Sequence, residues 1–407
     1  MNETTHPDAA GTPETSWAPF SASASAGFLA VLGLVMIYSA SALPGTLENG
    51  PGEFHFLTKQ FLFLLLGTSV LLLTARAPFA WIEKLGTPAL VAALLGLGLV
   101  LVPGIGHEVN GARRWIRWGA LGVQVSDFAK LALVLFIAVH LGRDPRVASS
   151  FRRGAAPVLG GIALVSGLVV VEPDFGTALF LASLGGLLAV VGGLRWRHLV
   201  PPILLGLPAM AFFVWKKFDH VQDRIAVFLD PGLDPLGKGH QVRQSLIALG
   251  SGGPLGAGLG AGRQKLFFLP EDFTDFILAL VGEEMGLAGT LLVVGCYLVF
   301  FLSALDIARK ARTVTGSLVA LGVGTLVSLQ GFINVAVVTA SVPTKGISLP
   351  FVSYGGSSLV VMMAALGLLL NVARNPRRPA SDARADPAGA PDSVSPSRAA
   401  VAAGGGA

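Results

Sequence analysis

The chain has 407 residues, of which 53% are hydrophobic and only 13% carry a charged side chain. Soluble domains have about 25% charged residues, so these proportions exclude an ordinary soluble enzyme and predict an integral membrane protein. The net charge is only +5, so the basic residues are informative mainly through their positions. The single cysteine, Cys296, lies in an apolar run, which excludes a disulfide framework and a zinc site.

The two ends of the chain, residues 1–25 and 376–407, are rich in small residues and proline and are predicted to be disordered cytoplasmic tails. Between them, residues 26–375 contain apolar runs close to the length of about 20 residues that crosses a bilayer as a helix. No basic residue precedes the first run and no clear cleavage site follows it, so a signal peptide is not expected. The sequence therefore predicts an all-α membrane protein, a polytopic bundle of ten transmembrane helices. The runs lie at about 26–43, 56–75, 88–103, 128–142, 156–171, 175–194, 199–215, 276–302, 317–341 and 356–373.

Basic residues follow every second predicted span. Because cytoplasmic loops carry the excess of Lys and Arg, both ends of the chain are predicted to be cytoplasmic. Two outward loops, 104–127 and 216–275, break this pattern. The second is long, and long loops escape the rule, whereas the arginines of the first need either local acidic partners or an anion outside the membrane. The cytoplasmic basic residues are Arg76, Lys84, Arg143, Arg146, Arg152, Arg153, Arg195, Arg197, Arg309, Lys310, Arg312, Arg374, Arg377 and Arg378.

Two glycine-rich stretches of the long loop carry weak signals. GLDPLGKG at 232–239 nearly matches a phosphate-binding loop, but Gly239 replaces the hydroxyl residue that would hold magnesium, so nucleotide binding is not expected. GSGGPLGAGLGAG at 250–262 is either a flexible loop or a segment lying against the membrane. The seven histidines are scattered, so no histidine-based metal or catalytic site is predicted.

Ionisable side chains inside apolar runs are costly and usually face a cavity or a partner. Asp127 and Lys130 open the fourth run three residues apart on one helix face, either as a plain ion pair or as part of a site. Glu283 and Glu284 lie in the eighth run, and Asp275 precedes Glu283 by roughly 12 Å along a helix axis. These acids could line one polar groove that opens outward. From the pattern alone, Asp275 is better explained as a helix N-cap.

The outward stretches that carry long motifs are NGARRWIRWG (110–119), QVSDFAK (124–130), EPDFGTA (172–178), HQVRQSLIALGSGG (240–253), GLGAGRQKLFFLPEDFTDFI (258–277), GEEMG (282–286) and PTKGISLPFVSYGGSS (343–358). In this order the set resembles the SEDS family (shape, elongation, division and sporulation proteins), which polymerises cell-wall glycan. The resemblance covers about residues 27–375. PTKG at 343–346 is more similar to the division branch, FtsW, than to the elongation branch, RodA.

The resemblance implies a peptidoglycan glycosyltransferase in the bacterial cytoplasmic membrane, with its active face outside the cell. Its substrate is lipid II, a disaccharide-peptide linked to undecaprenyl diphosphate. The 4-hydroxyl of one sugar attacks the anomeric carbon of another, and the lipid diphosphate leaves. The family's essential acid falls on Asp275, its tryptophan on Trp115 and its lysine on Lys130. The hydroxyl needs a base within hydrogen-bond reach, and the diphosphate needs positive charge beside it.

The implied active site has Asp275 as the catalytic base. A divalent cation, Mg²⁺ or Mn²⁺, could be held by Glu271 and Asp275, and no nucleotide is expected. The implied partners are a class B penicillin-binding protein, which crosslinks the new strands, and other division proteins, with no nucleic acid. The residues expected to bind the substrate are Arg114, Trp115, Asp127, Lys130, Arg243, Gln244, Ser245, Arg263, Lys265, Glu271, Glu283, Lys345 and Ser353.

The chain departs from the family pattern at several positions near the expected site, where Asp272 adds a charge. Asp127 stands where the family usually has Glu, Glu172 where Gln is common, Arg113 where Ser is frequent and Phe273 where His is frequent. None of these changes affects Asp275, so they bear on fine positioning rather than on the activity.

Three other functions stay open from the sequence. Buried charges such as Lys130 and Glu283 also suit a transporter that flips lipid II, although the charges cluster on one face and internal repeats are not evident. The other two are a RodA-type elongation polymerase and a scaffold that recruits division proteins.

Overall fold

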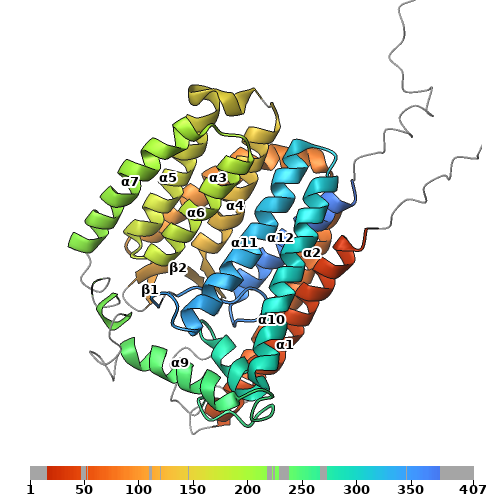
Figure 1. Cartoon of the computed structure of the whole chain (residues 1–407), viewed down its shortest axis with the longest axis vertical. Helices are drawn as coiled ribbons and strands as arrows, with labels where there is room; N and C mark the ends of the chain where they lie inside the picture. Colours follow the sequence, from red (N-terminus) through yellow and green to blue (C-terminus); the bar gives the residue numbers. More distant parts are fainter. Residues whose placement is uncertain are drawn as a thin grey trace, which may run out of the picture.

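The computed structural model describes residues 16–46, 52, 54–109, 112–119, 121–144, 146–217, 222, 225–228, 238–265, 273–344 and 346–375. Most of them belong to long helices (Figure 1). In chain order the elements are α1 (Ala18–Thr46), α2 (His55–Arg76), α3 (Phe79–Leu101), β1 (Gly106–Val109), β2 (Ala112–Trp118), β3 (Leu121–Gln124), α4 (Val125–Gly142), the 3₁₀ helix η1 (Val147–Ser149), the π-helix η2 (Phe151–Ala155), α5 (Ala156–Val171), α6 (Phe175–Val191), α7 (Trp196–Lys217), α9 (Lys238–Gly252), α10 (Ile277–Lys310), α11 (Val314–Val338) and α12 (Gly356–Ala373).

Eight of the described helical segments are long and apolar enough to cross a membrane. They are α1 to α4, α5 together with the π-helix before it, and α10 to α12. Two further predicted runs form helices: α6 is an apolar helix of 17 residues, and α7 has 22 residues with three prolines inside. The mostly helical, polytopic membrane fold is therefore confirmed, while the count of ten spans and the place of the large outward loop stay predictions.

Helix α1 starts earlier than the sequence predicts. It begins at Ala18, eight residues before the predicted border at residue 26, so residues 18–25 are helical rather than part of a disordered tail. Small side chains allow α1 to lie close against α10, and Ser21 Oγ is 2.7 Å from Ser303 Oγ. An alternation of Ala and Ser is too polar to be recognised as an apolar run, and its helical state depends on the partner helix.

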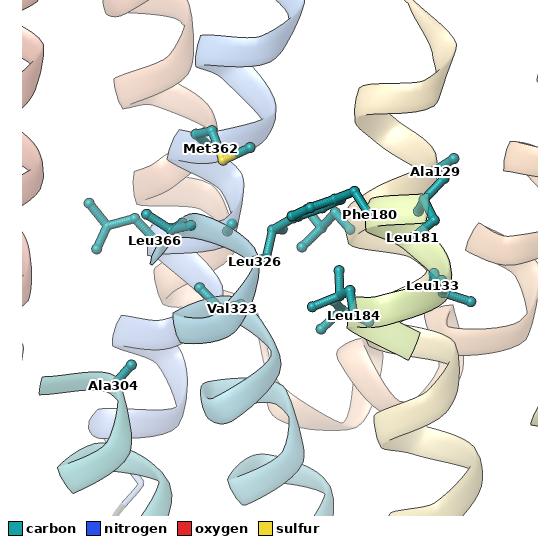
Figure 2. Packing of buried hydrophobic residues seen from close by; sticks show 14 of the residues in the cluster. Ala129, Leu133, Phe180, Leu181, Leu184, Ala304, Val323, Leu326, Met362 and Leu366 are labelled. Atoms are coloured by element: carbon teal, nitrogen blue, oxygen red, sulfur yellow. The ribbon is translucent and has the colours of Figure 1, made fainter. Parts of the chain in front are cut away.

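Helix α4 is the centre of the bundle. In its apolar stretch of 18 residues, 83% of the residues are buried, whereas only 11% are buried in the corresponding stretch of α2. Figure 2 shows core side chains from α4, α6, α11 and α12 facing one another, among them Leu133, Leu184, Leu326 and Leu366. The outer helices instead expose leucines, such as Leu73 of α2. A helix that is apolar on all sides is typical of a membrane span, so these outer faces are the ones that suit lipid.

A small antiparallel sheet, β1-β2-β3, lies inside the loop predicted at 104–127. His107 pairs with Trp115 across β1 and β2, and Trp115 pairs with Gln124 across β2 and β3. The sheet is a departure from the all-α fold expected from the sequence. Strands of four and seven residues are too short to produce a clear period-two pattern, which is why the sequence does not reveal them.

One end of the bundle brings together segments that are far apart in the sequence. Figure 1 shows the sheet, α9 and the start of α10 at this end, and the first residue of α1 and the last of α12 toward the other end. Since α4, α5 and α6 alternate in direction, as do α10, α11 and α12, the segments 172–174, 339–344 and 346–355 also lie here. The candidate site is built from this end, which the charge pattern predicts to face outward.

Candidate active site

Asp275 lies in the turn 273–276, directly before α10. The helix begins at Ile277 and its N-cap is Phe276, which makes no side-chain cap hydrogen bond. Asp275 thus lies one residue before the N-cap position at which the cap interpretation would place it. Its side chain is half-buried, and a methyl group on Gly346 would lie 3.2 Å from Asp275 Oδ2. The carboxylate thus faces the segment that joins α11 to α12.

The segment between α11 and α12 fixes the backbone of this turn. Ser353 Oγ donates to Thr274 O and accepts a hydrogen bond from Leu349 N at 2.7 Å. Tyr354 N donates to Phe273 O at 2.9 Å, and the two aromatic rings lie 5.7 Å apart. Ser353, a predicted substrate-binding residue, therefore lies beside the turn that carries Asp275, and its hydroxyl is used to hold the main chain.

The ion pair expected from the spacing of Asp127 and Lys130 is confirmed. Lys130 Nζ donates to Asp127 Oδ1 at 2.9 Å, and both residues are buried. The same ammonium donates to Gln330 Oε1 at 3.1 Å and lies 5.7 Å from the centre of the Phe180 ring. Gln330 Nε2 in turn donates to Ser348 O at 2.9 Å. The pair is thus connected to the same segment that faces Asp275.

Two arginines of the short outward loop have local acidic partners. Arg114 Nη1 lies 3.4 Å from Asp174 Oδ2, and Arg113 Nε lies 3.2 Å from Glu108 Oε2. Of the two explanations that the sequence left open for these arginines, local pairing is the one observed. Trp115 is half-buried on the central strand, next to Arg114.

Glu172 is a buried acid beside Arg114. The residue is 1% exposed, and neither of its side-chain oxygens has a hydrogen-bond partner. Burial, followed by the negative charge of Asp174, raises the pKa of Glu172 to about 8, with Arg114 opposing the shift. The carboxyl group is therefore protonated and uncharged at neutral pH.

The glycine-rich loop is ordered around a break in α10. The loop, residues 250–262, wraps around Gly286, whose φ of 68° interrupts the helix. Across the break, two N–H groups of the loop donate to Glu283 O and Glu284 O at 2.9 and 3.0 Å. A methyl group on Gly256 would come within 2.2 Å of Glu284 O, so the close approach requires glycine there. The loop satisfies the backbone groups that the break leaves without helical partners.

The side chain of Glu284 joins α10 to this loop, to the residues that follow it and to α1. Its Oε1 accepts hydrogen bonds from Ser39 Oγ at 2.7 Å and from Lys265 Nζ at 3.0 Å. Its Oε2 accepts from Gly260 N at 2.9 Å. Lys265, a predicted substrate-binding residue, is therefore the buried partner of Glu284.

Glu283 has an equivalent role on the neighbouring residues of the loop. Its Oε1 accepts a hydrogen bond from Arg263 N at 2.7 Å, and its Oε2 accepts from Gln264 N at 3.2 Å. The single outward groove expected for Glu283, Glu284 and Asp275 is therefore not what these contacts build, because the two glutamates bind the loop. The side chain of Arg263, in contrast, is exposed.

Helix α9 brings three more predicted residues to this end of the bundle. Ser245 is fully buried, and its Oγ donates to Val338 O at the end of α11 at 2.6 Å. Gln244 Nε2 lies 3.3 Å from His240 Nε2, and the side chain of Arg243 is exposed. Ser245 thus attaches α9 to the bundle, and Arg243 presents a cation at its surface.

Glu271 and Lys345 lie outside the described residues. Among the residues that are described, no three His, Cys, Asp or Glu side chains form a group that could hold a metal ion.

Two functional candidates were missed by the sequence reasoning, Gln330 and Asn334 of α11. Asn334 Nδ2 donates to Asp275 O at 2.7 Å and to Ile347 O at 2.8 Å. The sequence does show these two amides four residues apart inside an apolar run. Because a buried amide without a hydrogen-bond partner is costly, the pair could have been recognised as functional or structural from its position. The arrangement as a whole is a half-buried carboxylate on a fixed backbone, which can accept a proton from a bound hydroxyl group.

Known proteins resemble this chain over most of its length. The family model for cell cycle proteins of the FtsW, RodA and SpoVE type matches residues 21–378. A probable peptidoglycan glycosyltransferase FtsW of Geobacter metallireducens is 39% identical over 344 residues, which are 84% of this chain and 91% of the relative. Stage V sporulation protein E of Bacillus subtilis is 39% identical over 349 residues, 86% of this chain and 95% of the relative.

Solved structures show the same fold. The rod shape determining protein RodA of Thermus thermophilus superposes with a TM-score of 0.63 at 28% identity, covering 89% of this chain and 97% of RodA. A second solved structure is described as showing the structural coordination of polymerization and crosslinking by a peptidoglycan synthase complex. One of its chains superposes with a TM-score of 0.69 at 29% identity, covering 87% of this chain and 97% of that chain. Since the family model and the relatives span nearly all of the membrane part, this chain belongs to the FtsW, RodA and SpoVE family of cell cycle proteins.

Proposed function

We propose that this chain is a peptidoglycan glycosyltransferase that polymerises lipid II during cell division, with Asp275 as the general base. The observation that carries the proposal is the turn of Asp275, whose main-chain carbonyls are fixed from three sides while its half-buried carboxylate faces Gly346. The names of the FtsW relatives support the reaction and the division role.

In the proposed reaction, the Asp275 carboxylate accepts the proton of the 4-hydroxyl group of one sugar. The hydroxyl oxygen then forms a bond to the anomeric carbon of another lipid II, and the bond from that carbon to the diphosphate breaks. Arg243 and Arg263 are exposed at the same end of the bundle and are the cations assigned to the leaving diphosphate. Lys130 and Lys265 are paired with Asp127 and Glu284 inside the protein. They are therefore assigned to the structure around the site and not to the leaving diphosphate.

A divalent cation at Asp275 would need further ligands. The described residues offer no group of three metal-binding side chains, and Glu271 lies outside them. The described residues therefore do not by themselves make a complete Mg²⁺ or Mn²⁺ site, and no step of the reaction is assigned to a cation.

The proposed topology places the Asp275 end outside the cytoplasmic membrane and both chain ends in the cytoplasm. The basic residues after every second predicted span support this orientation. A class B penicillin-binding protein is the proposed partner, supported by the similar chain that belongs to a peptidoglycan synthase complex. Division proteins beyond this transpeptidase are proposed partners as well.

Purified protein with lipid II, with and without the transpeptidase, tests the activity. Asp275→Ala is expected to lower the rate of glycan formation by about 10²–10⁴-fold, the usual contribution of a general base. Asp306→Asn is the control, because Asp306 lies near the opposite end of the same helix in an exposed pair with Lys310. Undiminished polymerisation by Asp275→Ala would remove the assigned base.

Flipping of lipid II is the alternative that the same protein can test. The buried charged residues of the described part lie at one end of the bundle and not along a path through it, which favours a polymerase. Labelled lipid II in reconstituted vesicles should be converted to glycan. Movement between leaflets without polymer formation would favour transport instead.

A further inference from the structure

Two amide side chains stand one turn apart inside α11. Gln330 is fully buried and Asn334 is 1% exposed, in a helix whose other buried residues are almost all apolar or small. A buried amide costs free energy unless it is hydrogen-bonded. Both amides donate to main-chain carbonyls of one segment: Gln330 Nε2 to Ser348 O at 2.9 Å and Asn334 Nδ2 to Ile347 O at 2.8 Å.

Each amide also reaches a residue of the proposed active site. Gln330 Oε1 accepts from Lys130 Nζ at 3.1 Å, and Asn334 Nδ2 donates to Asp275 O at 2.7 Å. Since Ile347 and Ser348 are neighbours in the chain, one short piece of backbone and two amides join the buried lysine to the proposed base.

The carbonyl that Asn334 binds is one that α10 does not use. In a regular helix, Asp275 O would accept a hydrogen bond from Ala279 N, four residues later. Here Ala279 N donates to Phe276 O at 2.8 Å instead. Asn334 therefore supplies a hydrogen bond to the residue that carries the carboxylate, at the point where the helix has not yet begun.

We infer that Asn334 is a positioning residue for the transfer step, acting through the main chain of Asp275, and that Gln330 sets the distance between this turn and Lys130. The inference rests on the proposed function. Losing the Asn334 donor leaves the buried carbonyl of Ile347 and the part-buried carbonyl of Asp275 without that partner and frees the Asp275 turn to shift. A shift of about 1 Å at a reacting group costs on the order of 100-fold in rate.

The chain contains a matched control for Asn334. Asn371 of α12 is 2% exposed and donates from Nδ2 to Thr74 O, Ala75 O and Ala77 O at 2.9, 3.3 and 2.6 Å. Like Asn334, it has a buried Oδ1 without a hydrogen-bond partner. It lies near the C-terminal end of α12, far along the bundle from Asp275, so the same substitution there changes the same chemistry without touching the site.

The experiment compares Asn334→Asp with Asn371→Asp, each of which keeps the shape of the side chain and replaces the NH₂ group with a carboxyl oxygen. Asn334→Asp is expected to lower kcat with lipid II by about 100-fold, with KM and the number of lipid II molecules bound per protein unchanged. Asn371→Asp carries a similar stability penalty. Because Asn371 lies far from Asp275, this variant should nevertheless keep kcat within about threefold of the wild type. Should Asn334→Asp not fold, Asn334→Ala is compared with Asn371→Ala in the same way.

The outcomes separate the inference from the proposed function. Equal kcat values for the Asn334 and Asn371 variants would overturn the inference, as would a loss of kcat matched by a loss of binding sites. If Asp275→Ala is inactive while Asn334→Asp keeps the wild-type rate, only the inference fails. If Asp275→Ala keeps the wild-type rate, the assigned base fails and the positioning role fails with it.

Discussion

The acids at the two sides of the start of α10 are used in opposite ways. Around Glu283 and Glu284, the hydrogen bonds fall on the carboxylate oxygens, which hold the glycine-rich loop. Around Asp275, the hydrogen bonds from Asn334 and from the segment before α12 fall on main-chain carbonyls, and the half-buried carboxylate faces Gly346. The hydrogen bonds on Glu283 and Glu284 thus hold the loop through the side chains of the two acids, whereas those from Asn334 and Ser353 hold the Asp275 turn through its main chain.

The largest stability effect is expected where the loop is held most tightly. Glu284→Gln removes the charge that pairs with Lys265 and leaves a buried ammonium without its counter-ion. Breaking such a pair costs about 3–5 kcal/mol, which thermal or denaturant unfolding in detergent would detect.

Asp306→Asn is the control for that comparison. It breaks the exposed pair with Lys310 on the same helix and should cost no more than about 1 kcal/mol. Equal losses for the two variants would mean that the Glu284 pair does not hold the loop.

Glu172 predicts a pH dependence of stability. Its pKa is about 8 in the folded protein against 4.5 when unfolded, so the folded state binds the proton more tightly. The stability that this group contributes is present below pH 4.5 and is lost as the pH rises to about 8. Glu172→Gln should therefore gain about 3 kcal/mol over the wild type between pH 5 and pH 7.5.

The control for Glu172 is Glu108→Gln, which changes an exposed acid paired with Arg113 at the same end of the bundle. Its stability difference from the wild type should stay small across the same pH range. A Glu172→Gln difference that does not change with pH would contradict a protonated Glu172.

The smallest of these effects is expected at the break in α10. Gly286→Ala places a side chain at φ 68° and brings a methyl group within 2.4 Å of Gly256 N, which should cost about 2 kcal/mol. Gly295→Ala, in the same helix with open space around it, should be neutral or stabilising by up to about 1 kcal/mol. The reverse order in unfolding experiments would show that the loop does not pack against the break as described.

Most of the membrane helices could be predicted, because each one is a long apolar run that is continuous in the sequence. The pair of Asp127 and Lys130 was also predictable, since a spacing of three residues places both on one helix face. The grouping of Glu283 with Asp275 failed for a physical reason: the break at Gly286 and the return of the loop 250–262 are contacts between distant segments. The spacing of residues along one helix does not reveal such contacts.

The amides of α11 illustrate the same limit in the candidate site. Gln330 and Asn334 are visible as costly polar residues in an apolar run, but their roles depend on which carbonyls they meet. Those carbonyls belong to a segment between α11 and α12 whose path the sequence does not specify. The predicted contributions of Glu271 and Lys345 lie outside the described residues and stay predictions.

The central claim is that Asp275 performs the chemistry, while Glu283 and Glu284 of α10 hold the fold. Its most direct test is the rate of lipid II polymerisation by Asp275→Asn and Glu283→Gln, at equal amounts of folded protein and with the transpeptidase present. We expect Asp275→Asn to lose about 10²–10⁴-fold while Glu283→Gln keeps most of the rate per folded molecule. An active Asp275→Asn beside an inactive, folded Glu283→Gln would contradict the account.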